Sequence, residues 1–224
     1  QFNALNYYTN EEITIPLDNT LTPIENANKY FARYNKLKRT YEAGTRLIAE
    51  IKDEIMHLES IINALDIATT ENDLNNIKEE LAVTGYIKKS GKSKNKGNSH
   101  NKPMHYISSD GFDMYVGKNN IQNDELTFKF ATGGDWWFHA KQMPGSHVIV
   151  KSDGRELPDK TYEEAAALAA YYSKGRDLEK VEVDYVLKKE VKKPAGAKPG
   201  FVVYYTNYSL IAIADISGIK LVSE

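Results

Sequence analysis

The chain has 224 residues and a formal net charge of −2, with 41% hydrophobic and 27% charged residues. This composition excludes a disordered chain and fits one or two globular domains. The absence of cysteine excludes a disulfide framework and a thiolate metal site. No apolar run approaches the ~20 residues that span a bilayer, so we expect no membrane insertion. Since the chain starts at Gln1, we expect it to be a piece of a longer protein.

The first 21 residues predict an irregular lead-in with one short strand at 13–17, followed by a long helix. Thr22, Pro23 and Glu25 have the spacing of a capped helix start. Apolar residues then recur along this helix at alternating spacings of three and four and form a seam on one side of it. This is the heptad pattern of a coiled coil, and the helix would be about 65 Å long. The seam residues are Ala27, Tyr30, Tyr34, Leu37, Tyr41, Gly44, Ile48, Ile51, Ile55, Leu58, Ile62 and Leu65.

Such a seam needs a partner helix. The only later candidate is a helix at 71–83, for which Thr70 is the expected cap. That helix is too short to cover the seam, so we expect the main partner upstream of Gln1 or in another chain. Homodimerisation through the seam is the alternative.

Residues 88–103 predict a lysine-rich linker, which divides a helical region at 1–87 from a second domain at 104–224. The segment could also be a basic arm that contacts phosphates. In the second domain, alternation predicts strands at 112–116, 126–130, 135–140, 147–151, 181–187, 202–206 and 210–214. One helix at 165–173 interrupts them, after an expected capping box at 161–164. We therefore predict an α+β fold, a long coiled-coil helix region followed by a mixed domain with a mainly antiparallel sheet.

The strand predicted at 135–140 has two different faces. One is apolar, with Trp136, Phe138 and Ala140. The other carries Asp135, Trp137 and His139, and His147 follows beside Ser146 at the start of the next strand. We expect Trp136 to be buried and Trp137 to be more exposed.

Three interpretations of this polar group stay open. The side chains could hold a metal or act in acid–base catalysis, but no second carboxylate lies in the motif. They could bond to one another and fix the turn. They could also form a nucleic-acid surface, with Trp137 as a stacking plane and His139, Ser146 and His147 as donors.

Two further segments could contact RNA or simply be polar turns. Residues 117–124 hold Lys118, Asn119, Asn120, Gln122 and Asn123, which suit phosphate and base edges. The second segment, 188–200, is a loop rich in lysine, glycine and proline that includes Lys192 and Lys193, and its glycines would let a nucleic-acid backbone approach.

Several separated motifs resemble one family in the right order: VGKNNIQND, DWWFHA, PGSHVIV, EAAALAAYYSK and VKKPAGAKPGFVVYY. They resemble the NFACT-R domain of RqcH-type ribosome quality-control proteins, whose Gram-positive members are also named fibronectin/fibrinogen-binding proteins. Upstream, PIENANKYFARYNKLKR resembles the start of the family's coiled-coil middle region.

This resemblance implies a cytoplasmic RNA-binding module, not an enzyme, without cofactor or metal. The implied partners are tRNA, the large ribosomal subunit with stalled peptidyl-tRNA, and upstream domains of the same chain, in support of alanine tailing. The alternative is an adhesin at the bacterial surface that binds host fibronectin or fibrinogen. The expected RNA-binding residues are Lys118, Asn119, Asn120, Gln122, Asn123, Asp135, Trp137, His139, Ser146, His147, Lys192 and Lys193.

Overall fold

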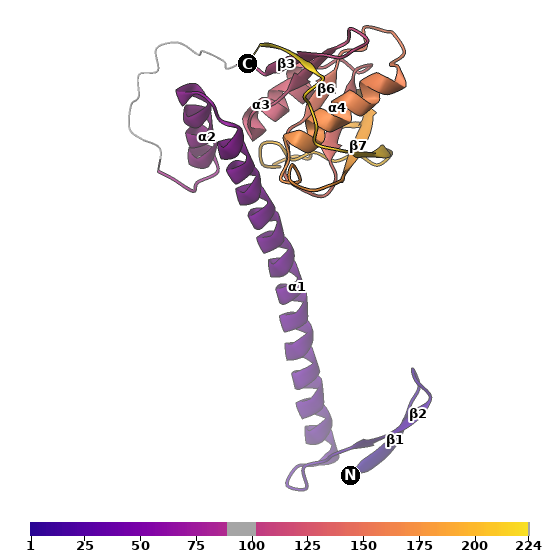
Figure 1. Ribbon diagram of the computed structural model, residues 1–224. Helices are drawn as coiled ribbons and strands as arrows, with labels where there is room; N and C mark the ends of the chain where they lie inside the picture. The colour runs from indigo at the N-terminus through magenta and orange to yellow at the C-terminus, as the bar shows by residue number, and fades with distance from the viewer. Residues whose placement is uncertain (89–101, 224) are drawn as a thin grey trace. The chain divides into compact units, whose positions relative to one another are not determined.

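The computed structural model describes residues 1–88 and 102–223 (Figure 1). The contacts divide the chain into two compact units, Gln1–Asp53 and Glu54–Glu224. Most of the predicted linker at 88–103 lies outside the described residues, so its role as a boundary or basic arm stays a prediction.

The first unit holds a hairpin and the beginning of the long helix. Strands β1 (Phe2–Asn6) and β2 (Glu11–Ile15) pair antiparallel. Helix α1 (Pro23–Ile67) starts at the expected cap, where the Thr22 amide donates to Glu25 Oε2 at 2.7 Å and the Glu25 amide donates to Thr22 Oγ1 at 3.3 Å. The heptad seam stays exposed, for example at Tyr41, so the partner expected for it stays a prediction.

The second unit begins with the end of α1, against which helix α2 (Glu71–Val83) packs through Ile61, Ala64 and Ile77. The bounds predicted for α2 are confirmed. Thr70 caps it, accepting from the Asp73 amide at 3.2 Å, while Asp73 accepts from the Thr70 amide at 3.0 Å. This reciprocal pair satisfies backbone donors that the first turn leaves open.

A seven-stranded sheet forms the body of the second unit, in the order β8-β7-β5-β6-β4-β3-β9. Every neighbouring pair is antiparallel, which confirms the predicted α+β class and mainly antiparallel sheet. The strands are β3 (Met104–Ile107), β4 (Asp113–Val116), β5 (Trp136–Ala140), β6 (Val148–Val150), β7 (Val181–Leu187), β8 (Tyr208–Ala212) and β9 (Lys220–Ser223).

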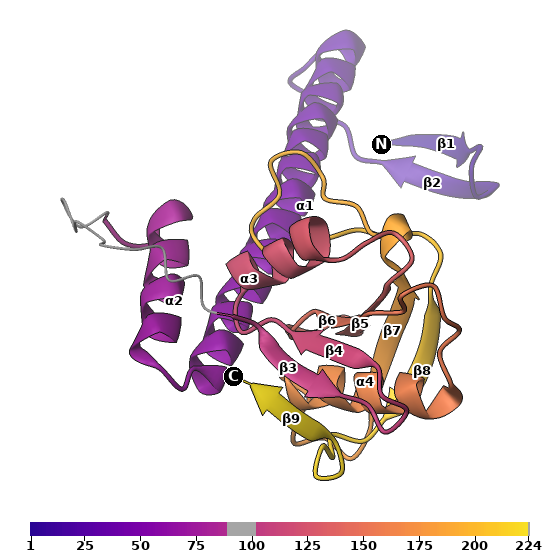
Figure 2. The same cartoon turned by 90° about the horizontal axis from the view of Figure 1, so that it is seen from above.

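Both faces of this sheet are covered (Figure 2). Helix α4 (Asp159–Tyr171) lies on one face and packs its alanines against Phe138, Val148 and Val150. The other face carries helix α3 (Asn120–Glu125), the π-helix η1 (Leu126–Phe130), and, after the short helix η2 (Lys188–Glu190), residues of the segment 191–204. Two hydrophobic cores therefore sandwich the sheet.

Two predicted strands are wrong. Residues 126–130 continue the helix that Asn119 caps, because helix propagation from an existing turn is favourable even where side chains alternate. In the segment 202–206, the structure has only an isolated bridge between Val203 and Lys192. Strands β1, β3 and β9 were not predicted.

The capping box predicted at 161–164 is also wrong, because α4 starts earlier, after Pro158. The side chains of that motif instead fix the turn between β3 and β4 to the helix. Thr161 Oγ1 donates to Asp110 Oδ2 at 2.8 Å, and Glu164 accepts from the Ser109 amide at 2.8 Å. Within the described residues, no helix is both long and apolar enough to cross a membrane.

Candidate nucleic-acid interface

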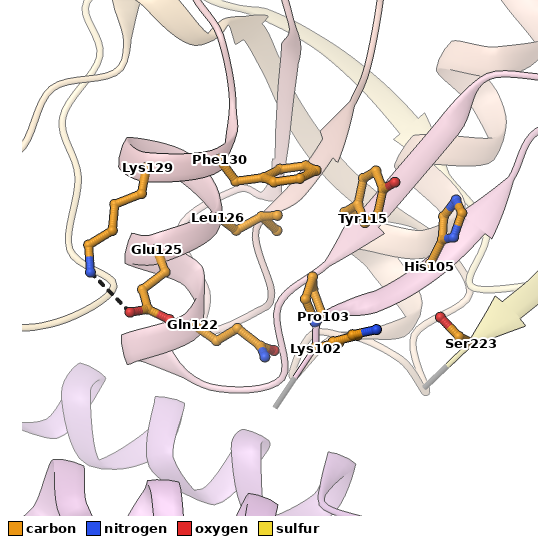
Figure 3. A pocket seen from close by; sticks show the side chains of 10 residues that line it. All are labelled: Lys102, Pro103, His105, Tyr115, Gln122, Glu125, Leu126, Lys129, Phe130 and Ser223. Carbon is orange, nitrogen blue, oxygen red and sulfur yellow. Dashed lines mark hydrogen bonds and ion pairs between the residues drawn. The ribbon is translucent and has the colours of Figure 1, made fainter. Parts of the chain in front are cut away.

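A partly open pocket of about 700 Å³ lies beside β3 and β4, on the face that carries α3 and η1 (Figure 3). Its lining combines aromatic rings with two lysines. The lining residues are Lys102, Pro103, His105, Tyr115, Gln122, Glu125, Leu126, Lys129, Phe130 and Ser223.

Three rings stand in a row along this pocket (Figure 3). His105 and Tyr115 are direct partners in the β3–β4 ladder, and their rings stack at 4.6 Å with an angle of 9°. Phe130, the last residue of η1, meets the Tyr115 ring edge-on at 4.7 Å. Strand pairing and the end of the π-helix thus fix an aromatic wall, in which Phe130 is still 44% exposed.

A polar contact holds one of these rings, and nearby carboxylates act on a second. His105 Nε2 lies 2.7 Å from Asp113 Oδ1. Burial raises the pKa of the Tyr115 phenol, and the nearby carboxylates of Asp113 and Asp153 raise it further. Tyr115 therefore keeps its proton at neutral pH and presents an uncharged ring with a hydroxyl donor.

The cations of the pocket are Lys102 and Lys129. Lys129 is exposed and its ammonium lies 3.0 Å from Glu125 Oε1, a surface pair that costs little to break. Lys102 is the last lysine of the basic segment that begins at Lys88. Lys151 does not line the pocket, but its ammonium lies 5.1 Å from the centre of the Phe130 ring and pairs with Asp135.

This arrangement suits an unpaired nucleotide. Flat rings such as Tyr115 and Phe130 can stack on a base of any identity, and neighbouring lysines can attract its phosphates. The carboxylate of Glu125 opposes phosphate unless Lys129 stays close to it. The pocket therefore fits stacking better than dense phosphate binding.

Comparison with known proteins agrees with this chemistry. Residues 1–100 match the description "NFACT N-terminal and middle domains", and residues 102–206 match "NFACT protein RNA binding domain". A solved structure, the C-terminal part of the fibronectin/fibrinogen-binding protein from Streptococcus suis, is 42% identical with a TM-score of 0.76. The match covers 89% of this chain and 79% of that one.

The chain belongs to the NFACT family.

Its curated relatives include "Rqc2 homolog RqcH" of Streptococcus suis, 46% identical over 200 residues, and of Bacillus subtilis, 40% identical over 219 residues. These matches cover 89% and 96% of the NFACT chain, but only 36% and 38% of the relatives. The chain thus spans little more than a third of their length. The resemblance to RqcH-type proteins is confirmed.

Of the residues predicted to contact RNA, only Gln122 lines the pocket of this NFACT domain. Most of the others are buried: Lys118, Asn119, Asn120, Asn123, Asp135, Trp137, Ser146 and His147. His139 and Lys193 are half-buried and Lys192 is exposed. No observation tests their contact with RNA, which stays a prediction.

The structure brings the amide side chains of residues 119–123 together, but they form hydrogen bonds with other groups of the protein. Asn119 accepts from the Gln122 amide at 2.9 Å as the cap of α3, and Gln122 Oε1 accepts from the Lys118 amide at 2.7 Å. Asn123 Oδ1 accepts from the His147 amide at 3.0 Å. The Lys118 ammonium is buried 3.8 Å from Asp73 Oδ1 of α2, so its charge faces a carboxylate inside the protein.

Trp137, His139 and His147 share one side of the sheet, as the alternation predicted, but the expected exposure of Trp137 is wrong. Its side chain is 0% exposed, because η1 and the segment 191–204 cover that face. The Trp137 ring stacks on His139 at 5.5 Å. His147 Nδ1 lies 2.8 Å from Thr127 Oγ1.

Burial also removes the charge of these histidines. It lowers the pKa of His139 to about 4 and that of His147 well below its ordinary value. Both imidazoles are therefore neutral at pH 7, so neither supplies a cation for phosphate.

Asp135 and Lys193 hold loops in place. Asp135 accepts from the Thr132 amide at 2.7 Å and from the Lys151 ammonium at 2.5 Å, rather than orienting a histidine. Burial opposes ionisation, but these donors outweigh it and lower the pKa of Asp135. Lys193 pairs with Asp124.

Sequence reasoning missed the three rings of the pocket. Tyr115 alternates with the core residues Met114 and Val116 in a predicted strand, so the sequence indicates that its side chain points away from that core. The pairing of Tyr115 with His105 could not be predicted, because β3 is only four residues long and was not predicted as a strand. Phe130 was assigned to a strand rather than to the end of a helix.

Proposed function

We propose that residues 102–223 form an RNA-binding module that stacks unpaired bases on the rings of His105, Tyr115 and Phe130. The observation that carries this proposal is the aromatic wall beside Lys102 and Lys129, in a domain that matches an RNA-binding description. The module would serve a ribosome quality-control protein, a role supported by the RqcH relatives.

At finer detail, we propose that the RNA is tRNA, whose loops and ends offer unpaired bases. The parent protein would recognise a large ribosomal subunit with stalled peptidyl-tRNA and recruit alanyl-tRNA for alanine tailing in the cytoplasm. The module itself would carry no catalytic step, and upstream domains of the parent would complete the reaction.

Replacing Phe130 by alanine should weaken tRNA binding by about 5- to 150-fold, since one stacking contact is worth ~1–3 kcal/mol. The salt dependence should change little, because the ring releases no counterion. The measurement is tRNA affinity at several salt concentrations. Lys129→Ala should instead reduce the salt slope.

Tyr171→Ala is the matched control. Its ring is 38% exposed, close to the 44% of Phe130, but it lies on α4, on the opposite face of the sheet. This variant should bind tRNA like the unaltered chain. A folded Phe130→Ala variant with unchanged affinity would show that the pocket does not stack bases.

A second candidate function is binding of host fibronectin or fibrinogen at the bacterial surface. It is favoured by the name of the Streptococcus suis protein whose C-terminal part shares 42% identity with this chain. Nuclease-treated chain should be tested on immobilised fibronectin and fibrinogen. Saturable binding to either protein that persists in the Phe130→Ala variant would support a second activity at another surface. If the chain binds neither fibronectin nor fibrinogen, this second function is rejected and only the RNA proposal remains.

A further inference from the structure

A second pocket, of about 560 Å³, opens on the opposite face of the sheet, beside the edge strand β8. It is distinct from the pocket in Figure 3 and shares no lining residue with it. Its lining combines four aromatic rings, two carboxylates and two aliphatic side chains. The lining residues are Trp136, Asp159, Tyr162, Glu163, Tyr185, Tyr208, Leu210 and Ile211.

The rings form a connected cage. Trp136 of β5 meets Tyr162 of α4 at 5.2 Å and 79°, and Tyr162 lies 5.3 Å from Tyr185 of β7. Tyr185 stacks on Tyr208 of β8 at 5.5 Å. One helix and three strands therefore bring rings with different orientations to one hollow. Aromatic faces carry partial negative charge and attract cations.

The charged groups at this cage are mainly acidic. Asp159 and Glu163 stand in the first half of α4, and both are exposed. Lys160 is the neighbouring cation, and its ammonium lies 3.3 Å from Glu163 Oε2 in an exposed pair. Burial raises the pKa of Tyr162 to about 12, and the rings and carboxylates nearby, Asp159 among them, add to this shift. The hollow therefore favours positive charge and disfavours phosphate.

We propose that this cage binds an arginine side chain on an extended segment of a partner protein. A guanidinium is flat and weakly hydrated, so it can stack on rings such as Trp136 or Tyr208 while it donates paired hydrogen bonds to a carboxylate. Asp159 and Glu163 supply those carboxylates at the rim. An extended segment can run along the exposed edge of β8, where Tyr208 and Ile211 are 63% and 68% exposed.

The two tryptophans allow a direct test. Trp136 lines the cage, whereas Trp137 is buried on the other face, so the two indole N–H resonances act as a probe and an internal reference. The 15N-labelled 224-residue chain is titrated with a blocked Gly-Arg-Gly-Arg-Gly peptide, and with the same peptide carrying citrulline. The Trp136→Phe variant assigns the resonances.

The arginine peptide should shift the Trp136 resonance saturably and leave that of Trp137 in place, while the citrulline peptide should have no effect. Changing Asp159→Asn together with Glu163→Gln should weaken binding by about tenfold or more, since each loses a charge-assisted hydrogen bond. The matched control is Asp177→Asn with Glu179→Gln, which removes the same charge from exposed acids outside the cage. It should bind the peptide normally.

Three results would overturn the proposal: equal shifts with citrulline, no shift at millimolar arginine peptide, or a Trp136 shift caused by a single-stranded oligoribonucleotide instead. The last would make the cage a nucleic-acid site. Phe130→Ala should leave peptide binding intact, so failure of the RNA proposal and failure of this one are distinguishable.

Discussion

Replacing Trp137 by alanine should lower the free energy of unfolding by about 3–5 kcal/mol, the range for deleting a large buried aromatic side chain. The Trp137 side chain is 0% exposed and packs with Ile149, Val186 and Tyr204 in the second core. The cavity left behind would be lined by residues from both the sheet and the covering segments, which cannot easily collapse. Equilibrium denaturation in urea measures this loss.

Phe130→Ala is the control, because its ring belongs to the same side of the sheet but is 44% exposed. Phe130→Ala should lower the free energy of unfolding clearly less than Trp137→Ala does. Trp136→Ala should also lower it less than Trp137→Ala, since Trp136 is only half-buried beside α4. If Trp137→Ala were no more destabilising than Phe130→Ala, the second core would not have the packing described.

Glu80→Gln should stabilise the second unit at alkaline pH. Glu80 is 0% exposed on α2, and its Oε1 accepts from Asn120 Nδ2 at 2.7 Å. Among the described residues, its Oε2 has no hydrogen-bond partner. Burial raises the pKa of Glu80 from 4.5 to about 7, with a smaller contribution from Asp124, although Asn120 opposes the shift. His57 Nε2 lies 3.9 Å away and does not form a close pair.

The pKa of Glu80 is higher in the folded state than in the unfolded state. The neutral Glu80 carboxyl therefore contributes its full stabilisation below pH 4.5, and this contribution is lost as pH rises through about 7. The loss is on the order of 3 kcal/mol. Glutamine stays neutral, so the variant should match the unaltered chain near pH 4.5 and exceed it at pH 8. Denaturation at several pH values measures the difference.

Burial also shifts the pKa of the neighbouring His57, in this case downward. The effect of His57 on the pH dependence of stability is present in both the Glu80→Gln variant and the unaltered chain, so the comparison between them removes it. The matched control is Glu79→Gln, the exposed neighbour on α2, which should leave the pH profile unchanged. Parallel profiles for the Glu80→Gln variant and the unaltered chain would contradict the buried, uncharged state of Glu80.

Local signals predicted helices α1, α2 and α4 and the strand-rich domain, but not α3 or η1. Residues 71–83 and 181–187 were predicted with the bounds that the structure has, because a cap or an unbroken alternation defines each from its own residues. The alternation of residues also predicted correctly that Trp136 and Trp137 lie on opposite sides of the sheet. It could not predict how exposed Trp137 is, because the segments that cover Trp137 lie elsewhere in the sequence.

The candidate site was hidden for the same reason. Amides such as Asn120 suggested recognition, but a side chain that bonds to Ser60 and Glu80 across the fold has the same composition as one that bonds to a base. The ring wall depends on the register of β3 against β4 and on where η1 ends. Neither follows from local periodicity.

Ultraviolet crosslinking of tRNA to the 224-residue chain, followed by mass spectrometry of the nucleotide-bearing peptides, tests the RNA-binding pocket most directly. Adducts should map to Tyr115 and Phe130, with Lys102 and Lys129 beside them, and should diminish in Phe130→Ala. Adducts that spare these four residues and gather on the segment with Lys192 and Lys193 would contradict the pocket as the site where RNA binds.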